Sequence, residues 1–132
     1  MILLDSNAVS DLMKDNAAIK ARVAASTVPI STSVVVQGEI WYGIELLPAG
    51  KRHNDIEQKA VHVLGILPAE PVTEPIARIY AKIRAHADAN GLTLDDNDLW
   101  IAATVMNFAG VLVSRDKDFS RVPGLTVEDW TV

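Results

Sequence analysis

The chain opens with Met1-Ile2-Leu3-Leu4-Asp5-Ser6-Asn7, and this stretch decides the class of fold. An apolar run that stops at polar residues is typical of a short buried strand that turns into a helix. Val111-Leu112-Val113, also followed by polar residues, repeats the pattern late in the chain. Strands that are apolar throughout are typical of parallel sheets with both faces covered. The two runs therefore predict an α/β protein.

Segments of helical and extended character alternate between these runs. Apolar spacing predicts helices over residues 8–28 with a break at 14–16, and over residues 34–47, 51–64, 74–90 and 97–108. Short strands are predicted at residues 29–31 and 125–127, and residues 67–73, which carry two prolines, are expected to form an edge strand or a loop. Because no hairpin signal joins two strands, we predict a mostly parallel central sheet of about four or five short strands with helices on both faces.

Length and composition set further limits. A chain of 132 residues with 49% hydrophobic and 22% charged residues matches one folded domain, so we predict a single domain over residues 1–132. Its apolar stretches fall far short of the roughly 18 residues of a membrane span, and the opening run is too short for a signal peptide. The absence of cysteine excludes a disulfide framework, a zinc ribbon and a thiolate nucleophile. We expect a cytoplasmic protein without a membrane partner.

The charge balance restricts how nucleic acid could be bound. The net charge is −5, from 17 acidic and 12 basic side chains. Proteins that hold nucleic acid mainly by releasing counterions need a strongly basic face. If nucleic acid is a substrate of this chain, a local feature must therefore attract it.

Four carboxylates lie where a solvated acid is not expected. Asp5 and Asp116 each follow a predicted buried strand, at the end where open α/β sheets place their ligands. Glu39 lies in mid-helix beside an apolar stripe, and Asp98 shares a helical face with apolar residues that should meet the sheet. One shared explanation is that the four carboxylates converge and bind cations, which relieve their mutual repulsion. All-oxygen ligands favour Mg²⁺ or Mn²⁺, and the histidines show no ligand spacing that would favour zinc.

Helix capping is the alternative explanation for some of these positions. The Asp5 side chain could cap the helix that follows it, and one of residues 95–98 could cap the helix after Thr93. Glu39 is not explained in this way, because a mid-helix glutamate beside apolar residues needs a partner to offset its desolvation.

Four segments in order resemble the PIN-domain ribonucleases, and within them the small VapC-type toxins of bacterial toxin–antitoxin pairs, including the FitB-like branch. The segments are Leu3 to Asn7, Ser33 to Glu39 with Tyr42-Gly43, Asn97 to Ala103, and Leu112 to Phe119. The ending, with Val122 to Leu125 and Glu128 to Trp130, is also similar. The resemblance covers nearly the whole chain. It implies a PIN-like fold and a metal-dependent endoribonuclease that hydrolyses RNA phosphodiester bonds, as the toxin of a type II toxin–antitoxin system.

The resemblance also implies roles for individual residues. Asp5, Glu39, Asp98 and Asp116 match the acidic centre that holds Mg²⁺ or Mn²⁺ and serves catalysis. Ser6, Asn7 and Ser114 match small polar positions that support the acids, with Ser6 in place of the more usual threonine.

Some neighbouring positions leave alternatives open. Val36 stands where relatives often have a threonine, so the start of the glutamate-bearing helix is open. Asp95 or Asp96 could supply an outer contact to the metal. The basic residues near Asp116 are candidate contacts to the RNA backbone, with an ordinary solvated loop as the alternative; they are Arg115, Lys117 and Arg121.

Partners follow from the same resemblance. We expect RNA as substrate, a homodimer held through helices, and a small antitoxin whose tail occupies the acidic groove. DNA is expected to be reached only indirectly, through the antitoxin. The helix with Trp41, Tyr42, Ile44 and Leu47 is a candidate contact surface, although such spacing is also typical of a core.

Two functions from other classes are weighed against the nuclease. One is a catalytically weak PIN-like binding or scaffold module. The other is a phosphoryl-accepting domain with Asp5 as nucleophile. The second has little support, because Asn7 occupies the position where a second carboxylate is expected.

Overall fold

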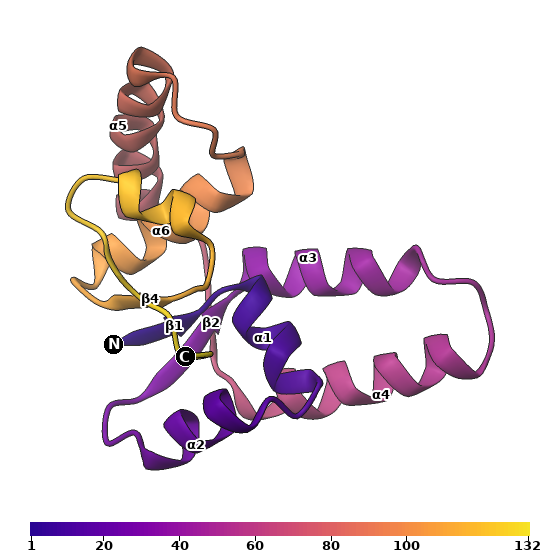
Figure 1. Cartoon of the computed structure of the whole chain (residues 1–132). Helices are drawn as coiled ribbons and strands as arrows, with labels where there is room; N and C mark the ends of the chain where they lie inside the picture. Colours follow the sequence, from indigo (N-terminus) through magenta and orange to yellow (C-terminus); the bar gives the residue numbers. More distant parts are fainter.

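The computed structural model describes all of residues 1–132 and shows a five-stranded sheet covered by helices (Figure 1). The strands are β1 (Ile2–Leu4), β2 (Ile30–Ser33), β3 (Ala69–Glu70), β4 (Val111–Val113) and β5 (Thr126–Glu128). They lie in the order β3-β2-β1-β4-β5, and every neighbouring pair is parallel. The predicted α/β class and parallel sheet are confirmed, and residues 67–73 supply an edge strand.

Six α-helices and one short 3₁₀ helix connect the strands. They are α1 (Ser6–Met13), α2 (Ala17–Ala25), α3 (Val34–Glu45), α4 (Lys51–Ile66), α5 (Glu74–Asn90), α6 (Asp96–Asn107) and the 3₁₀ helix η1 (Lys117–Arg121). Figure 1 shows α5 and α6 on one side of the sheet and α1 and α2 on the other, while α3 and α4 form a hairpin that extends away from it. The helices therefore cover both faces, as predicted, and α5 begins and ends at the predicted residues.

Side-chain caps explain where two helices begin. α1 begins at Ser6, before the predicted residue 8, because the Asp5 carboxylate accepts a hydrogen bond from the Ala8 N–H at 2.8 Å. The Ser33 hydroxyl accepts a hydrogen bond from the Val36 N–H at 3.1 Å and so caps α3. The start of the glutamate-bearing helix, left open by the valine at position 36, is thereby settled at Val34.

Two further differences from the predicted elements have local causes. The helix predicted to run to residue 28 ends at Ala25, because the Ser26 hydroxyl bonds to the backbone of Val28 and competes with the helical pattern. The 3₁₀ helix η1 was not predicted, because its five residues are too few to show an apolar period.

The core surrounds the two central strands. Leu3, Leu4 and Leu112 of β1 and β4 are fully buried, and α6 adds buried Ile101 and Val105 from one side. Because β1 and β4 are parallel neighbours, their carboxyl ends open at the same edge of the sheet. The fold thus brings residues that follow Leu4 and Val113 close together. None of the helices has both the length and the apolar character needed to cross a bilayer.

Candidate active site

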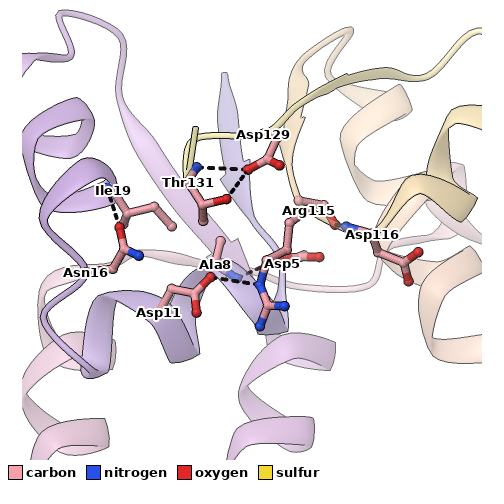
Figure 2. Close-up of polar contacts among 10 residues, drawn as sticks. Asp5, Ala8, Asp11, Asn16, Ile19, Arg115, Asp116, Asp129 and Thr131 are labelled. Atoms are coloured by element: carbon pink, nitrogen blue, oxygen red, sulfur yellow. Dashed lines mark hydrogen bonds and ion pairs between the residues drawn. The ribbon is translucent and has the colours of Figure 1, made fainter.

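Asp5 lies at the centre of this edge. Its backbone N–H donates to the carbonyl of Val113 at 3.1 Å, which extends the β1–β4 ladder by one step, and the residue is only 3% exposed. The carboxylate caps α1, so the capping role considered from the sequence is confirmed (Figure 2). Burial raises the pKa of Asp5 to about 6; hydrogen bonds from Ser114 and the Ala8 N–H oppose this rise, and the charges of Asp116 and Glu39 add to it.

Glu39 reaches the same region from α3. It is half-buried, and its Oε1 accepts a hydrogen bond of 2.7 Å from the hydroxyl of Ser6, the first residue of α1. This bond supplies the partner that a mid-helix glutamate beside apolar residues needs. Ser6 is therefore a supporting residue that connects two helices at the site.

Asp98 lies in the first turn of α6 and does not cap it. Asp95 is the cap, and its carboxylate accepts a hydrogen bond from the Asp98 N–H at 2.9 Å. Asp96 is turned toward α5, where it accepts a hydrogen bond from the Tyr80 hydroxyl at 2.9 Å. Burial raises the pKa of Asp98 to about 7, with further contributions from the charges of Asp95 and Glu39. Of the three acids at this helix start, Asp98 carries the strongest signature of a functional group.

Asp116 follows β4 and starts η1. Its carboxylate accepts a hydrogen bond from the Asp118 N–H at 2.9 Å, and its own N–H donates to the Ser114 hydroxyl oxygen at 3.0 Å. Ser114 is buried and hydrogen-bonds to the Asp5 carboxylate as well. This serine thus supports two acids at once. Asn7, also expected to support the site, is half-buried in the first turn of α1 and its side chain makes no hydrogen bond.

The basic residues near Asp116 have different surroundings. The Nε of Arg115 donates to Oδ2 of Asp11 at 3.0 Å, whereas Arg121 lies 4.0 Å from Asp118. Lys117 is exposed and forms no ion pair. Sequence reasoning missed Asp11, because its partner is 104 residues away and no local pattern connects them.

Residues 2–125 match the family model described as PIN domain. The chain belongs to the PIN-domain family. It is 31% identical to Toxin FitB of Neisseria gonorrhoeae over 88% of each chain, and 29% identical to VapC ribonuclease Y4jK of Sinorhizobium fredii over 96% of this chain and 95% of the relative. The resemblance to this group is thereby confirmed.

Solved structures agree with the sequence relatives. A chain of the crystal structure of VapBC2 from Rickettsia felis, which is bound to a DNA fragment from their promoter, is similar in fold to this PIN domain, with a TM-score of 0.89. The two chains are 25% identical, and the match covers 98% of this chain and 99% of that one. This PIN domain therefore has the fold of one chain of a VapBC complex over nearly its whole length.

The four carboxylates of this PIN domain influence one another electrostatically, but they do not form a closed cage. Asp5 is affected by the charges of Asp116 and Glu39, and Asp98 by that of Glu39. No three acidic or histidine side chains surround a common point as ligands of one ion. Mg²⁺ fits such an arrangement, because it is usually held by one or two carboxylates and keeps several of its waters. The oxygen-only donor set is equally suited to Mn²⁺.

These pKa shifts predict how the metal-free protein responds to pH. The folded state keeps protons on Asp5 and Asp98 up to about pH 6 and 7, whereas unfolded aspartates lose theirs near 3.8. The folded state thus binds more protons in this window, and the free energy of unfolding falls as pH rises through it. In chelator at about pH 8, Asp98→Asn should be more stable than wild type by about 1–2 kcal/mol, after allowing for solvent screening of a half-exposed group.

Urea unfolding at about pH 8 and about pH 4 measures this difference. Most of the stability gain of Asp98→Asn should disappear at the lower pH, where the wild-type carboxyl is protonated in the folded state and about half protonated in the unfolded state. Taking the difference in unfolding free energy between wild type and Asp98→Asn at each pH cancels the titration of all other groups. An equal gain at both values would show that charge at position 98 does not destabilise the fold.

Proposed function

We propose that this PIN domain is a metal-dependent endoribonuclease that acts as the toxin of a toxin–antitoxin pair. One observation supports the proposal: Asp5 feels the charges of Asp116 and Glu39, Asp98 feels that of Glu39, and none of these four carboxylates forms an ion pair with a basic side chain. Arg115 and Arg121, the nearby arginines, pair with Asp11 and Asp118 instead. A carboxylate that is removed from water without a basic partner, as Asp5 is, is unfavourable unless a cation or a proton neutralises it.

The residues divide the work in the proposed mechanism. Asp5, Glu39, Asp98 and Asp116 would hold Mg²⁺ or Mn²⁺, directly or through water. The bound ion supplies a water of lowered pKa and neutralises charge on the phosphate. Ser6 and Ser114 hold Glu39 and Asp5 in place by hydrogen bonds. Arg115, Lys117 and Arg121 are exposed and follow or precede Asp116 closely in the chain, so they are candidate contacts to the RNA backbone.

RNA cleavage tests the proposal. The purified protein should cut one or more members of a panel of single-stranded and stem–loop RNAs in Mg²⁺ or Mn²⁺, and none in chelator. Asp98→Asn, purified in parallel, should not cut, which controls for a contaminating nuclease. Equal cutting by both proteins would point to contamination or to a wrongly assigned site. Absence of cutting by antitoxin-free wild type across the panel would favour the scaffold function instead.

The proposal extends to partners. Relatives with this fold are solved as antitoxin complexes, some with DNA. For this PIN domain we propose a small antitoxin as protein partner, and contact with DNA only through that antitoxin. We also propose that the chain forms a homodimer and cleaves RNA in the cytoplasm. Tyr42 of α3 and Leu46, the residue that follows this helix, are each 66% exposed and form apolar surface that a protein partner would cover. Light scattering of the purified chain should give the mass of two copies, and a monomer mass would contradict the homodimer.

A further inference from the structure

Arg115 and Asp11 form an ion pair beside the acidic site. Figure 2 shows the Arg115 side chain reaching from the end of β4 to α1, where its Nε donates to Oδ2 of Asp11 at 3.0 Å. The Asp11 side chain is only 13% exposed, whereas that of Arg115 is 49% exposed. The Asp11 carboxylate is therefore the buried partner of the pair, and the Arg115 guanidinium is the partner that faces solvent.

Most donors of this guanidinium are unused. Arginine carries five N–H donors in a planar fork, and only the Nε of Arg115 has an acceptor in the protein. Asp129 is close enough for the positive charges of Arg115 and Lys117 to contribute to its lowered pKa. Its Oδ1 accepts hydrogen bonds from the N–H and hydroxyl of Thr131, at 2.8 and 2.6 Å, and neither of its oxygens bonds to Arg115. The two terminal nitrogens of Arg115 are thus free to bind an anion.

Arg115 is flanked along the chain by residues assigned to the acidic site. Its chain neighbours are Ser114, which bonds to Asp5, and Asp116, which starts η1. Arg115, Asp116 and Lys117 line one shallow cleft of about 260 Å³. An anion held by Arg115 in this cleft would be adjacent to the acidic site.

We propose that Arg115 binds a phosphate of the RNA next to the one that is cleaved, and that Asp11 is the positioning residue that aims it. This inference rests on the proposed nuclease function. Two parallel N–H donors of an arginine match two phosphate oxygens. Because the pair with Asp11 is neutral as a whole, it adds little attraction at a distance and acts at short range, by fixing the register of the RNA. Holding the side chain beforehand reduces the rotamer freedom lost on binding.

Stability alone gives a weak reason for the pair. Ion pairs near the surface contribute only about 0–1 kcal/mol to folding. The pair Lys20–Asp15, also at 3.0 Å, is exposed on both sides and lies away from the acidic site. It therefore provides a control in which an ion pair of the same length is lost at a site with no assigned role in RNA binding.

The test measures KM and kcat on the panel RNA that the wild-type protein cleaves fastest. Arg115→Gln should raise KM about tenfold, and Asp11→Asn about fivefold, with kcat changed less than about twofold. Asp11→Glu keeps the charge and should restore most of the lost affinity. The double variant should be no worse than Arg115→Gln alone, because Asp11 acts through Arg115. Asp15→Asn should match wild type, and urea unfolding of each variant shows whether the fold is intact.

Each result separates this inference from the proposed function. Cleavage by Asp11→Asn with wild-type KM, or additive losses in the double variant, would overturn the role of Asp11 while the nuclease function stands. A loss confined to kcat would place Arg115 in catalysis and contradict phosphate positioning. Failure of the wild-type protein to cleave any RNA would remove the proposed function and this inference with it.

Discussion

Asp5→Asn should lower kcat for RNA cleavage by about 10³-fold or more, because it removes a charged metal ligand from the centre of the site. The substitution suits the position, since asparagine is also a good helix cap and can keep the 2.8 Å bond from the Ala8 N–H. Loss of a buried charge does not weaken the fold at neutral pH, where burial disfavours the ionised form of Asp5. The expected result is an inactive protein with at least wild-type stability, measured by single-turnover cleavage and by urea unfolding.

Two further variants separate the charge of Asp5 from its capping bond. Asp5→Ala removes both, so it should be inactive and also less stable than Asp5→Asn by about 1 kcal/mol. Asp95→Asn changes the matched cap of α6, which accepts a 2.9 Å bond, and should retain activity within a few-fold of wild type. Substantial cleavage by Asp5→Asn would show that this carboxylate holds no essential metal.

Phe119→Ala should lower the free energy of unfolding by about 3–5 kcal/mol. Phe119 is 1% exposed and is the one buried residue of η1, the segment that Asp116 caps. Removing its ring leaves a cavity beneath this segment, in a protein whose total stability is expected at about 5–15 kcal/mol. Because Asp116 and the basic residues belong to or adjoin η1, we expect cleavage to fall together with stability. Urea unfolding and single-turnover cleavage on one preparation measure both.

A conservative change and a surface change control for the loss of the ring. Phe119→Leu keeps most of the volume and should cost about 1 kcal/mol while activity persists. Phe108→Ala removes the same side chain from a position that is 44% exposed, and should change stability much less. If Phe119→Ala were as stable as Phe108→Ala, the packing of Phe119 would not stabilise η1 or fix the position of Asp116.

The class of fold and most of the elements could be predicted from the sequence, because they depend on local and periodic signals. Apolar runs at Ile2–Leu4 and Val111–Val113 are short, unbroken and bounded by polar residues, as buried parallel strands require. α5 has an apolar period and ends at Gly91, whose left-handed φ of 64° is easily adopted by glycine. α3 begins at the predicted residue 34, whereas η1 and the exact start of α1 depend on single side-chain bonds, which leave no period to detect.

The sequence by itself also determined which acids stand out, since Asp5 and Asp116 follow buried strands and Glu39 interrupts an apolar stripe. Only the tertiary structure decided how these acids are held and which neighbours matter. In the folded chain Asp95 caps α6, and Asp96 accepts a hydrogen bond from Tyr80. Ser6 donates a hydrogen bond to Glu39, and Arg115 pairs with Asp11. The physical reason is the separation along the chain of the residues that interact. Burial patterns repeat every few residues along the chain, whereas a hydrogen bond or ion pair between distant segments depends on how the sheet and helices bring them together.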